Sequence, residues 1–159
     1  MADLNVEDLF FDTSVLLTGM IDFGRQSESA LILMDLVAGG DDKPMTAWHC
    51  CLEFFSIATR LPEEYRLTTA DATLILLEEI LGRFSIRDLP TRSRRSFVDT
   101  LPRDSISGGQ IFDAHIAEIA RHSGAGAIVT ENRRDFVTLL RHGIPVINTQ
   151  EVMERLNWA

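Results

Sequence analysis

The sequence is poor in the residues that mark several common protein classes. It has only two cysteines, Cys50 and Cys51, and because they are adjacent a structural disulfide between them would be strained. With no other cysteine to pair with, both are expected to be reduced, buried thiols. The paired Cys and His patterns of zinc sites, including H-E-x-x-H, do not occur. Neither a disulfide-stabilised secreted module nor a zinc protein is expected.

Long apolar runs are also missing. No stretch reaches the roughly 18 residues that a membrane span requires, so no membrane association is expected. The segment MADLNVEDLF lacks the basic start and apolar block of a signal peptide, which predicts a cytoplasmic protein. With 159 residues, 45% of them apolar and 25% charged, the chain is expected to form a single globular domain over residues 1–159.

Lysine is almost absent. Lys43 is the only one, against fourteen arginines, and the net charge is −9. This balance argues against a surface broadly adapted to nucleic acid, although it allows local basic patches. Two arginine clusters occur in the sequence, Arg92, Arg94 and Arg95 in TRSRRSF and Arg133 and Arg134 in ENRRDF. The guanidinium fork suits phosphate, so both clusters are candidate phosphate contacts; a compositional habit of the source genome explains them equally well.

Glycine-rich phosphate loops are missing as well. The stretch SGGQ at 107–110 lacks the Walker lysine and the Rossmann spacing, and no G-x-S-x-G elbow occurs. The sequence therefore gives no sign of a P-loop nucleotide site, a dinucleotide site or a serine-hydrolase elbow.

Strand and helix signals alternate along the chain. Strands are predicted at 8–12, 43–47, 84–89, 125–130 and 144–149. Helices are predicted at 13–23, 27–39, 48–61, 69–84, 92–101, 110–124, 133–143 and 150–158, with Gly124 and Gly143 as C-terminal caps. This alternation predicts an α/β fold, a single three-layer α/β/α domain with a mostly parallel sheet and helices on both faces. Ligands in such folds bind beyond the carboxyl ends of the strands, where the strand order reverses.

One carboxylate, Asp12, interrupts the apolar run LFFDTSVLLTG at 9–19. A buried carboxylate there is costly without a partner outside the run. As the last residue of the first predicted strand, Asp12 should lie at the rim of the sheet, and Thr130 ends the strand AIVT in the same way. The alternative is that Asp12 only caps the next helix, a role that Thr13 and Ser14 could also fill.

Two further acids border apolar helix stripes without a cation nearby. Glu53 has only His49, one turn back, as a local partner. Asp113 has no basic residue within a turn, although a first-turn acid is also favoured by the helix dipole. If Asp12, Glu53 and Asp113 met at the rim, repulsion would raise their pKa values or require a cation. A hard divalent ion such as Mg²⁺ suits these oxygen ligands.

Four segments, FFDTSVLL, LEFFSIATR, SGGQIFDAHIAEIA and AIVTENRRDF, occur in this order along the chain. Together they give a sequence that resembles the PIN-domain ribonucleases, in particular the VapC-type toxins of toxin–antitoxin pairs. The resemblance covers essentially the whole chain. It implies a compact PIN-like α/β/α fold with an acidic pocket for Mg²⁺ or Mn²⁺ and endonucleolytic cleavage of RNA. It also implies homodimerisation and neutralisation by a cognate antitoxin protein.

The resemblance also assigns residues. Asp12, Glu53 and Asp113 take the places of the catalytic, metal-binding acids, and Ser14 holds the small polar position that steadies the first aspartate. The fourth acidic position carries Asn132, which offers an oxygen but no charge. Asp135 could contribute to the metal site through water, and Glu131 flanks it. The candidate substrate contacts are Ser14, Thr130, Arg133 and Arg134.

The sequence thus predicts a metal-dependent endoribonuclease in which the ion activates a water for in-line attack. Whether Glu53 or Asp113 orients that water stays open. A response-regulator receiver domain would need a late lysine, and Lys43 is far too early. A catalytically inactive PIN-like RNA- or protein-binding module is the stronger alternative, with Asn132 as its main argument. Apolar helices at 27–40 and 69–84 offer surface for a homodimer.

Overall fold

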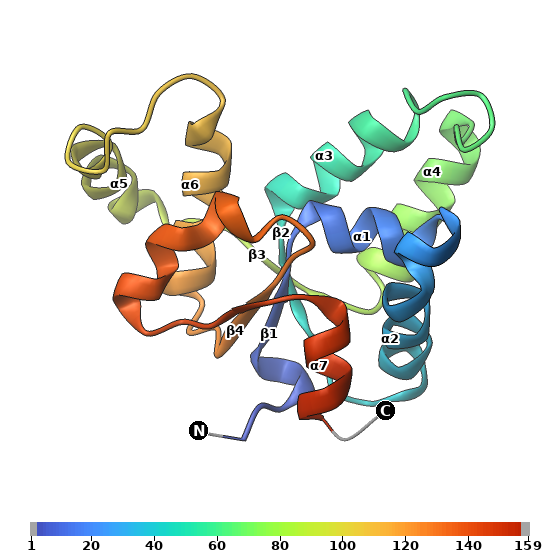
Figure 1. Cartoon of the computed structure of the whole chain (residues 1–159). Helices are drawn as coiled ribbons and strands as arrows, with labels where there is room; N and C mark the ends of the chain where they lie inside the picture. The colour runs from blue at the N-terminus through green and yellow to red at the C-terminus, as the bar shows by residue number, and fades with distance from the viewer. Residues whose placement is uncertain (1–2, 157–159) are drawn as a thin grey trace.

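The computed structural model describes residues 3–156 and contains one five-stranded sheet in the order β3-β2-β1-β4-β5 (Figure 1). The strands are β1 (Leu9–Phe11), β2 (Met45–Ala47), β3 (Ser85–Arg87), β4 (Ala127–Val129) and β5 (Val146–Ile147). All four pairings are parallel, so the expected mostly parallel sheet is parallel throughout the described residues. The predicted domain 1–159 and the end of the predicted helix 150–158 extend outside the described residues.

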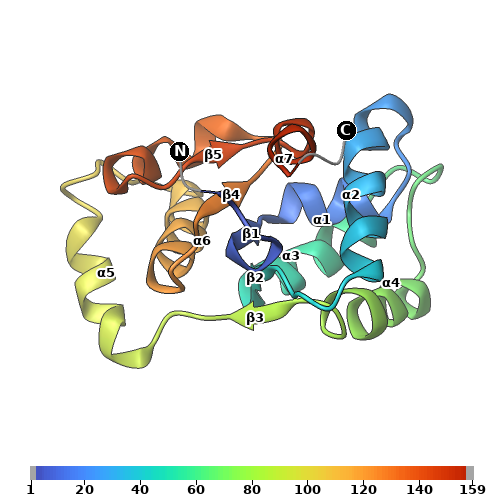
Figure 2. The same cartoon turned by 90° about the horizontal axis from the view of Figure 1, so that it is seen from below.

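Helices cover both faces of the sheet. The α-helices are α1 (Thr13–Met20), α2 (Glu28–Gly39), α3 (Trp48–Ala58), α4 (Thr69–Ile75), α5 (Arg94–Thr100), α6 (Gln110–His122) and α7 (Thr149–Arg155). Helical segments of 3₁₀ or π type are η1 (Val6–Asp8), η2 (Gly24–Ser27), η3 (Leu76–Ile80), η4 (Thr91–Ser93) and η5 (Arg133–His142). In Figure 2, α5, α6 and η5 lie on one side of the sheet and α1 to α4 lie on the other. The three-layer prediction is confirmed.

None of the helices in the described part of the chain is both long and apolar enough to cross a membrane.

Four predicted helices differ clearly from those observed, of which the one predicted at 48–61 ends at Ala58. The helix predicted at 13–23 ends at Met20, because Ile21 is extended and its carbonyl accepts the Ser27 hydroxyl. The helix predicted at 69–84 is an α-helix only to Ile75 and continues as a wider π-helical turn, η3. The helix predicted at 133–143 is a 3₁₀ segment with a break at Phe136. Its buried residues Phe136 and Leu139 are three apart, which matches the three-residue 3₁₀ repeat.

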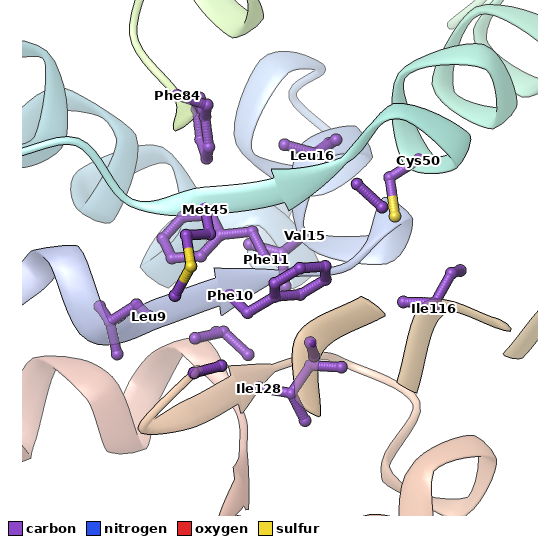
Figure 3. Packing of buried hydrophobic residues seen from close by; sticks show 14 of the residues in the cluster. Leu9, Phe10, Phe11, Val15, Leu16, Met45, Cys50, Phe84, Ile116 and Ile128 are labelled. Carbon is purple, nitrogen blue, oxygen red and sulfur yellow. The ribbon is translucent and has the colours of Figure 1, made fainter. Parts of the chain in front are cut away.

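The first strand lies at the centre of the core. All three residues of β1 are fully buried, because neighbouring strands flank it and helices cover both of its faces. Phe11 packs edge-to-face against Phe84, with ring centroids 5.3 Å apart (Figure 3). Cys50 is buried in the same cluster, and both cysteines are free, as predicted. The residue that follows β1 is therefore held on a rigid element.

The chain order creates one switch point in the sheet. Successive strands β1, β2 and β3 extend the sheet in one direction, and the chain then crosses back to place β4 on the other side of β1. Asp12 follows β1 and Thr130 follows β4 directly. The carboxyl ends of these two strands form the place where α/β folds bind ligands.

Candidate active site

Asp12 combines the two roles that its sequence position suggested. It is the N-cap of α1, where its Oδ1 accepts hydrogen bonds from the backbone N–H of Val15 at 3.3 Å and the Ser14 hydroxyl at 2.6 Å. Its Oδ2 accepts a hydrogen bond from the Thr130 hydroxyl at 2.8 Å. Its own N–H donates to the carbonyl of Val129, which continues the β1–β4 ladder. Asp12 is therefore a helix cap and a rim carboxylate at once.

The Asp12 carboxylate is buried, and no cationic side chain among the described residues forms an ion pair with it. Its exposed fraction is 5%. Burial raises its pKa from the ordinary value to about 6, against the lowering effect of the hydrogen bonds from Ser14 and Thr130. Ionisation of this group at neutral pH thus works against a desolvation cost that a bound cation would offset.

The loop after β4 is fixed over Asp12 by the same two hydroxyls. Ser14 Oγ accepts the backbone N–H of Glu131 at 3.0 Å, and Thr130 Oγ1 accepts that of Asn132 at 2.9 Å. Ser14 and Thr130 were predicted as substrate contacts, and in the structure both hydroxyls bind Asp12 and this loop. The Asn132 side chain is exposed and makes no capping hydrogen bond at η5.

Glu53 projects from α3 and is held by its predicted partner. His49 Nε2 lies 3.2 Å from Glu53 Oε2, one helical turn away. This contact is the main reason that the pKa of Glu53 lies below its ordinary value, with burial opposing it. The Thr13 hydroxyl is buried beside Glu53 and Cys50, and within residues 3–156 it lacks a partner at hydrogen-bond geometry. Sequence reasoning considered Thr13 only as a cap, although its adjacency to Asp12 was a usable signal.

Asp113 lies in the first turn of α6, half-buried. Its pKa is raised to about 6, mainly by burial and also by the negative charges of Asp135 and Glu53, while His49 opposes the rise. The acids of α3, α6 and η5 are therefore close enough to repel one another. Asp113 and Asp135 also line a single depression of about 240 Å³ together with Arg134.

The acids do not converge into a ready-made ligand cage. Over residues 3–156, no three His, Cys, Asp or Glu side chains are grouped closely enough to hold a metal ion. The three predicted ligands, Asp12, Glu53 and Asp113, are nevertheless all carboxylates, whose oxygens suit a hard cation such as Mg²⁺ or Mn²⁺. The raised pKa values of Asp12 and Asp113 and the unpartnered Thr13 hydroxyl fit such an ion. The donor chemistry fits, and the ligand set stays a prediction.

The two predicted arginines of η5 differ in their surroundings. Arg133 forms an ion pair with Glu151 of α7. Arg134 is exposed, forms no ion pair within the described residues, and lines two adjoining depressions that both contain Asp135. Arg92, Arg94 and Arg95 are exposed on η4 and α5. Of these arginines, Arg134 lines a depression that also contains Asp113 and Asp135.

Comparison with known proteins gives a family and a fold. A family model described as a PIN domain matches residues 8–134. VapC20 of Mycobacterium tuberculosis, described as a sarcin-ricin loop cleaving toxin, aligns with a TM-score of 0.55 and 17% identity over 76% of this chain and 86% of that one. VapBC2 from Rickettsia felis, bound to a DNA fragment from the VapBC2 promoter, aligns with a TM-score of 0.57 and 14% identity over 88% of this chain and 97% of that one. FitAcB from Neisseria gonorrhoeae aligns with a TM-score of 0.57 and 14% identity over 89% of this chain and 98% of that one. At these identities the structures show a shared fold. Among curated proteins, no sequence matches the chain.

Proposed function

The chain belongs to the PIN-domain family, and from this premise we propose that it is a metal-dependent endoribonuclease, the toxin of a toxin–antitoxin pair. The observation that carries the proposal is Asp12. Its carboxylate is buried at the switch point, held through both oxygens, and free of any cationic partner among the described residues. A group that is kept ionised at such a cost, next to other acids, supports a cation site.

The proposed ligands of Mg²⁺ or Mn²⁺ are Asp12, Glu53 and Asp113, with Asn132 and Asp135 offering further oxygens. When bound, such an ion lowers the pKa of a coordinated water and stabilises charge on the phosphoryl group. Ser14 and Thr130 keep Asp12 in one orientation, and His49 fixes one oxygen of Glu53. Glu53 carries its charge at neutral pH, whereas the raised pKa values of Asp12 and Asp113 mark the acids whose ionisation a cation would favour most.

RNA is the proposed substrate, supported by the family and by the sarcin-ricin loop cleavage stated for VapC20. The proposed protein partners are a cognate antitoxin and a second copy of the chain. Large apolar side chains are exposed on α2, α4 and η3 and directly after η3, and would suit such partners: Ile32, Leu36, Leu74, Leu77 and Leu81. The proposed location is the cytoplasm, which the free thiols of Cys50 and Cys51 favour.

Cleavage of a structured RNA by the purified protein tests the proposal. We expect cleavage in Mg²⁺ or Mn²⁺, none in a chelator, and a loss of orders of magnitude in Asp12→Asn, which keeps the shape and capping ability of the side chain. Asp35→Asn, an exposed acid on α2, is the matched control and should cleave normally. Circular dichroism checks the fold. Full activity in a folded Asp12→Asn protein would overturn the mechanism.

A second candidate function is binding without catalysis by a protein of the same fold. Asn132 stands where an acid is expected, and within residues 3–156 the acids are not grouped as a ligand cage. Both observations favour an inactive PIN-like RNA- or protein-binding module. Binding of RNA by the wild-type protein without cleavage in either metal would establish this alternative.

A further inference from the structure

A groove leads away from the acids along the side of α6 that packs against η5. The depression of about 240 Å³ that contains Asp113 and Asp135 shares Ala114 with a narrow depression of about 30 Å³. The narrow depression shares Glu118 and Arg141 with a third one of about 380 Å³. Because neighbouring depressions share lining residues, they adjoin one another in a row, which we call the path. The segments that line it, α5, α6 and the orange segment η5, lie together on the side of Figure 1 away from α2 and α4.

The far end of this path, which we call the basic end, is lined by arginines from three segments. Its donors are Ser96 of α5, Arg103 after α5, Arg121 of α6, and Arg141 and His142 of η5. None of the three arginines belongs to either arginine cluster of the sequence. In a chain with a net charge of −9, this gathering of positive charge depends on the fold alone.

Acids at the basic end offset only part of this charge. Arg141 pairs with Asp104 at 2.8 Å, and Arg121 pairs with Glu118 at 2.5 Å. Arg103 is exposed and has no ion pair in the described part of the chain. Three guanidinium groups therefore face two carboxylates. Exposed pairs of this kind are weak, so the paired guanidinium groups keep N–H donors that an anion can use.

The distance between the two ends suits a polymer better than a small anion. Asp113 and Arg121 are eight residues apart on α6, which corresponds to about 12 Å along the helix. We propose that the basic end binds a backbone phosphate of the RNA, remote from the phosphate that is cleaved at the acids. Guanidinium forks and a serine hydroxyl are donors that phosphate oxygens accept, and such contacts fix the register of the chain. This inference rests on the proposed function, because it takes RNA as the ligand.

RNA binding in the Asp12→Asn background tests the basic end without cleavage of the probe. The probe is a fluorescent single-stranded RNA, titrated over a range of salt concentrations. Arg103→Ala combined with Arg141→Ala should weaken binding about a hundredfold, since each of the two lost contacts is worth roughly one charged hydrogen bond, or about tenfold. The slope of log affinity against log salt should fall by about 0.7 per arginine. Arg25→Ala on η2, which lies outside the three depressions, is the matched control and should bind as the parent does.

Arg103→Ala alone leaves both ion pairs intact, so it should fold normally and still lower the slope by about 0.7. In the cleaving protein, the arginine variants should raise KM more for a long RNA than for a dinucleotide, which is too short to span the groove. An unchanged salt slope would overturn the inference. So would variants that bind RNA normally but lose binding of polyglutamate, since the basic end would then take an acidic protein segment. If the wild-type protein cleaves no RNA, the proposed function fails, and the salt slopes still decide the phosphate site.

Discussion

The Thr130 hydroxyl donates a 2.8 Å hydrogen bond to Oδ2 of Asp12, although 118 residues separate the two in the sequence. The Ser14 hydroxyl holds Oδ1 at 2.6 Å, so both oxygens of the buried carboxylate are fixed. The Thr130 contact joins the ends of β1 and β4, the two strands on either side of the switch point. Asp12 therefore has one orientation, which depends on residues from two distant parts of the chain.

Thr130→Val should impair catalysis while the protein stays folded. Valine has the same shape but donates no hydrogen bond, so the pKa of Asp12 should rise and the acidic limb of the pH–rate profile should move to higher pH. Loss of a hydrogen bond to a charged group corresponds to roughly a tenfold loss in kcat. Rates measured between pH 5 and 8 would check this. Thr73→Val on α4 is the control, and an unshifted profile in Thr130→Val would show that the contact does not tune Asp12.

In the metal-free protein, ionisation of Asp12 should lower the free energy of unfolding as the pH rises between about 4 and 6. The pKa of Asp12 is about 6 in the folded protein and near 3.8 when exposed, so in this window the folded state binds more protons than the unfolded state. The stability that the protonated Asp12 side chain contributes is fully present below about pH 4. Above pH 6 it is lost, which lowers the free energy of unfolding by up to about 3 kcal/mol. Urea unfolding of wild-type and Asp12→Asn proteins over this range measures it. A stability difference between them that is independent of pH would contradict the assignment.

Asp113→Asn should stabilise the metal-free protein and at the same time abolish the stabilisation that bound Mg²⁺ provides. Removal of this charge relieves the repulsion from Asp135 and Glu53, so the melting temperature without metal should rise. The further rise that Mg²⁺ gives the wild-type protein by binding the folded state should be lost. Melting curves with and without Mg²⁺ measure both, with Asp71→Asn on α4 as control. Undiminished stabilisation by Mg²⁺ in Asp113→Asn would remove Asp113 from the ligand set.

The exposed apolar side of α4 and η3 should form part of a homodimer interface. Leu74 is 52% exposed and Leu77 is 58% exposed, which leaves apolar surface that a second copy would cover. Sedimentation at micromolar concentration should show a dimer, and Leu77→Glu should shift it to monomer while its circular dichroism spectrum stays that of the folded protein. Val98→Glu, an equally exposed position on α5, is the control. A wild-type protein that sediments only as a monomer would refute this interface.

The sequence by itself determined the local elements and the rim position of Asp12. The apolar run ending at Phe11 predicts a buried strand, and Gly143 ends η5 in the left-handed conformation predicted for a cap, with φ of 72°. The His49–Glu53 contact was also predictable, because residues four apart always lie together on a helix. These features depend on interactions between residues that are close in the sequence, so they can be predicted from the sequence alone.

Only the tertiary structure decided which distant residues meet. The order β3-β2-β1-β4-β5 brings Thr130 to Asp12, and the packing of α6 against η5 brings Arg121 and Arg141 to one groove. The break at Phe136 arises in the same way, since its side chain is anchored in the core. Strand order and helix packing minimise the free energy of the whole core at once. No local pattern encodes them, because each contact depends on how all the other elements are placed.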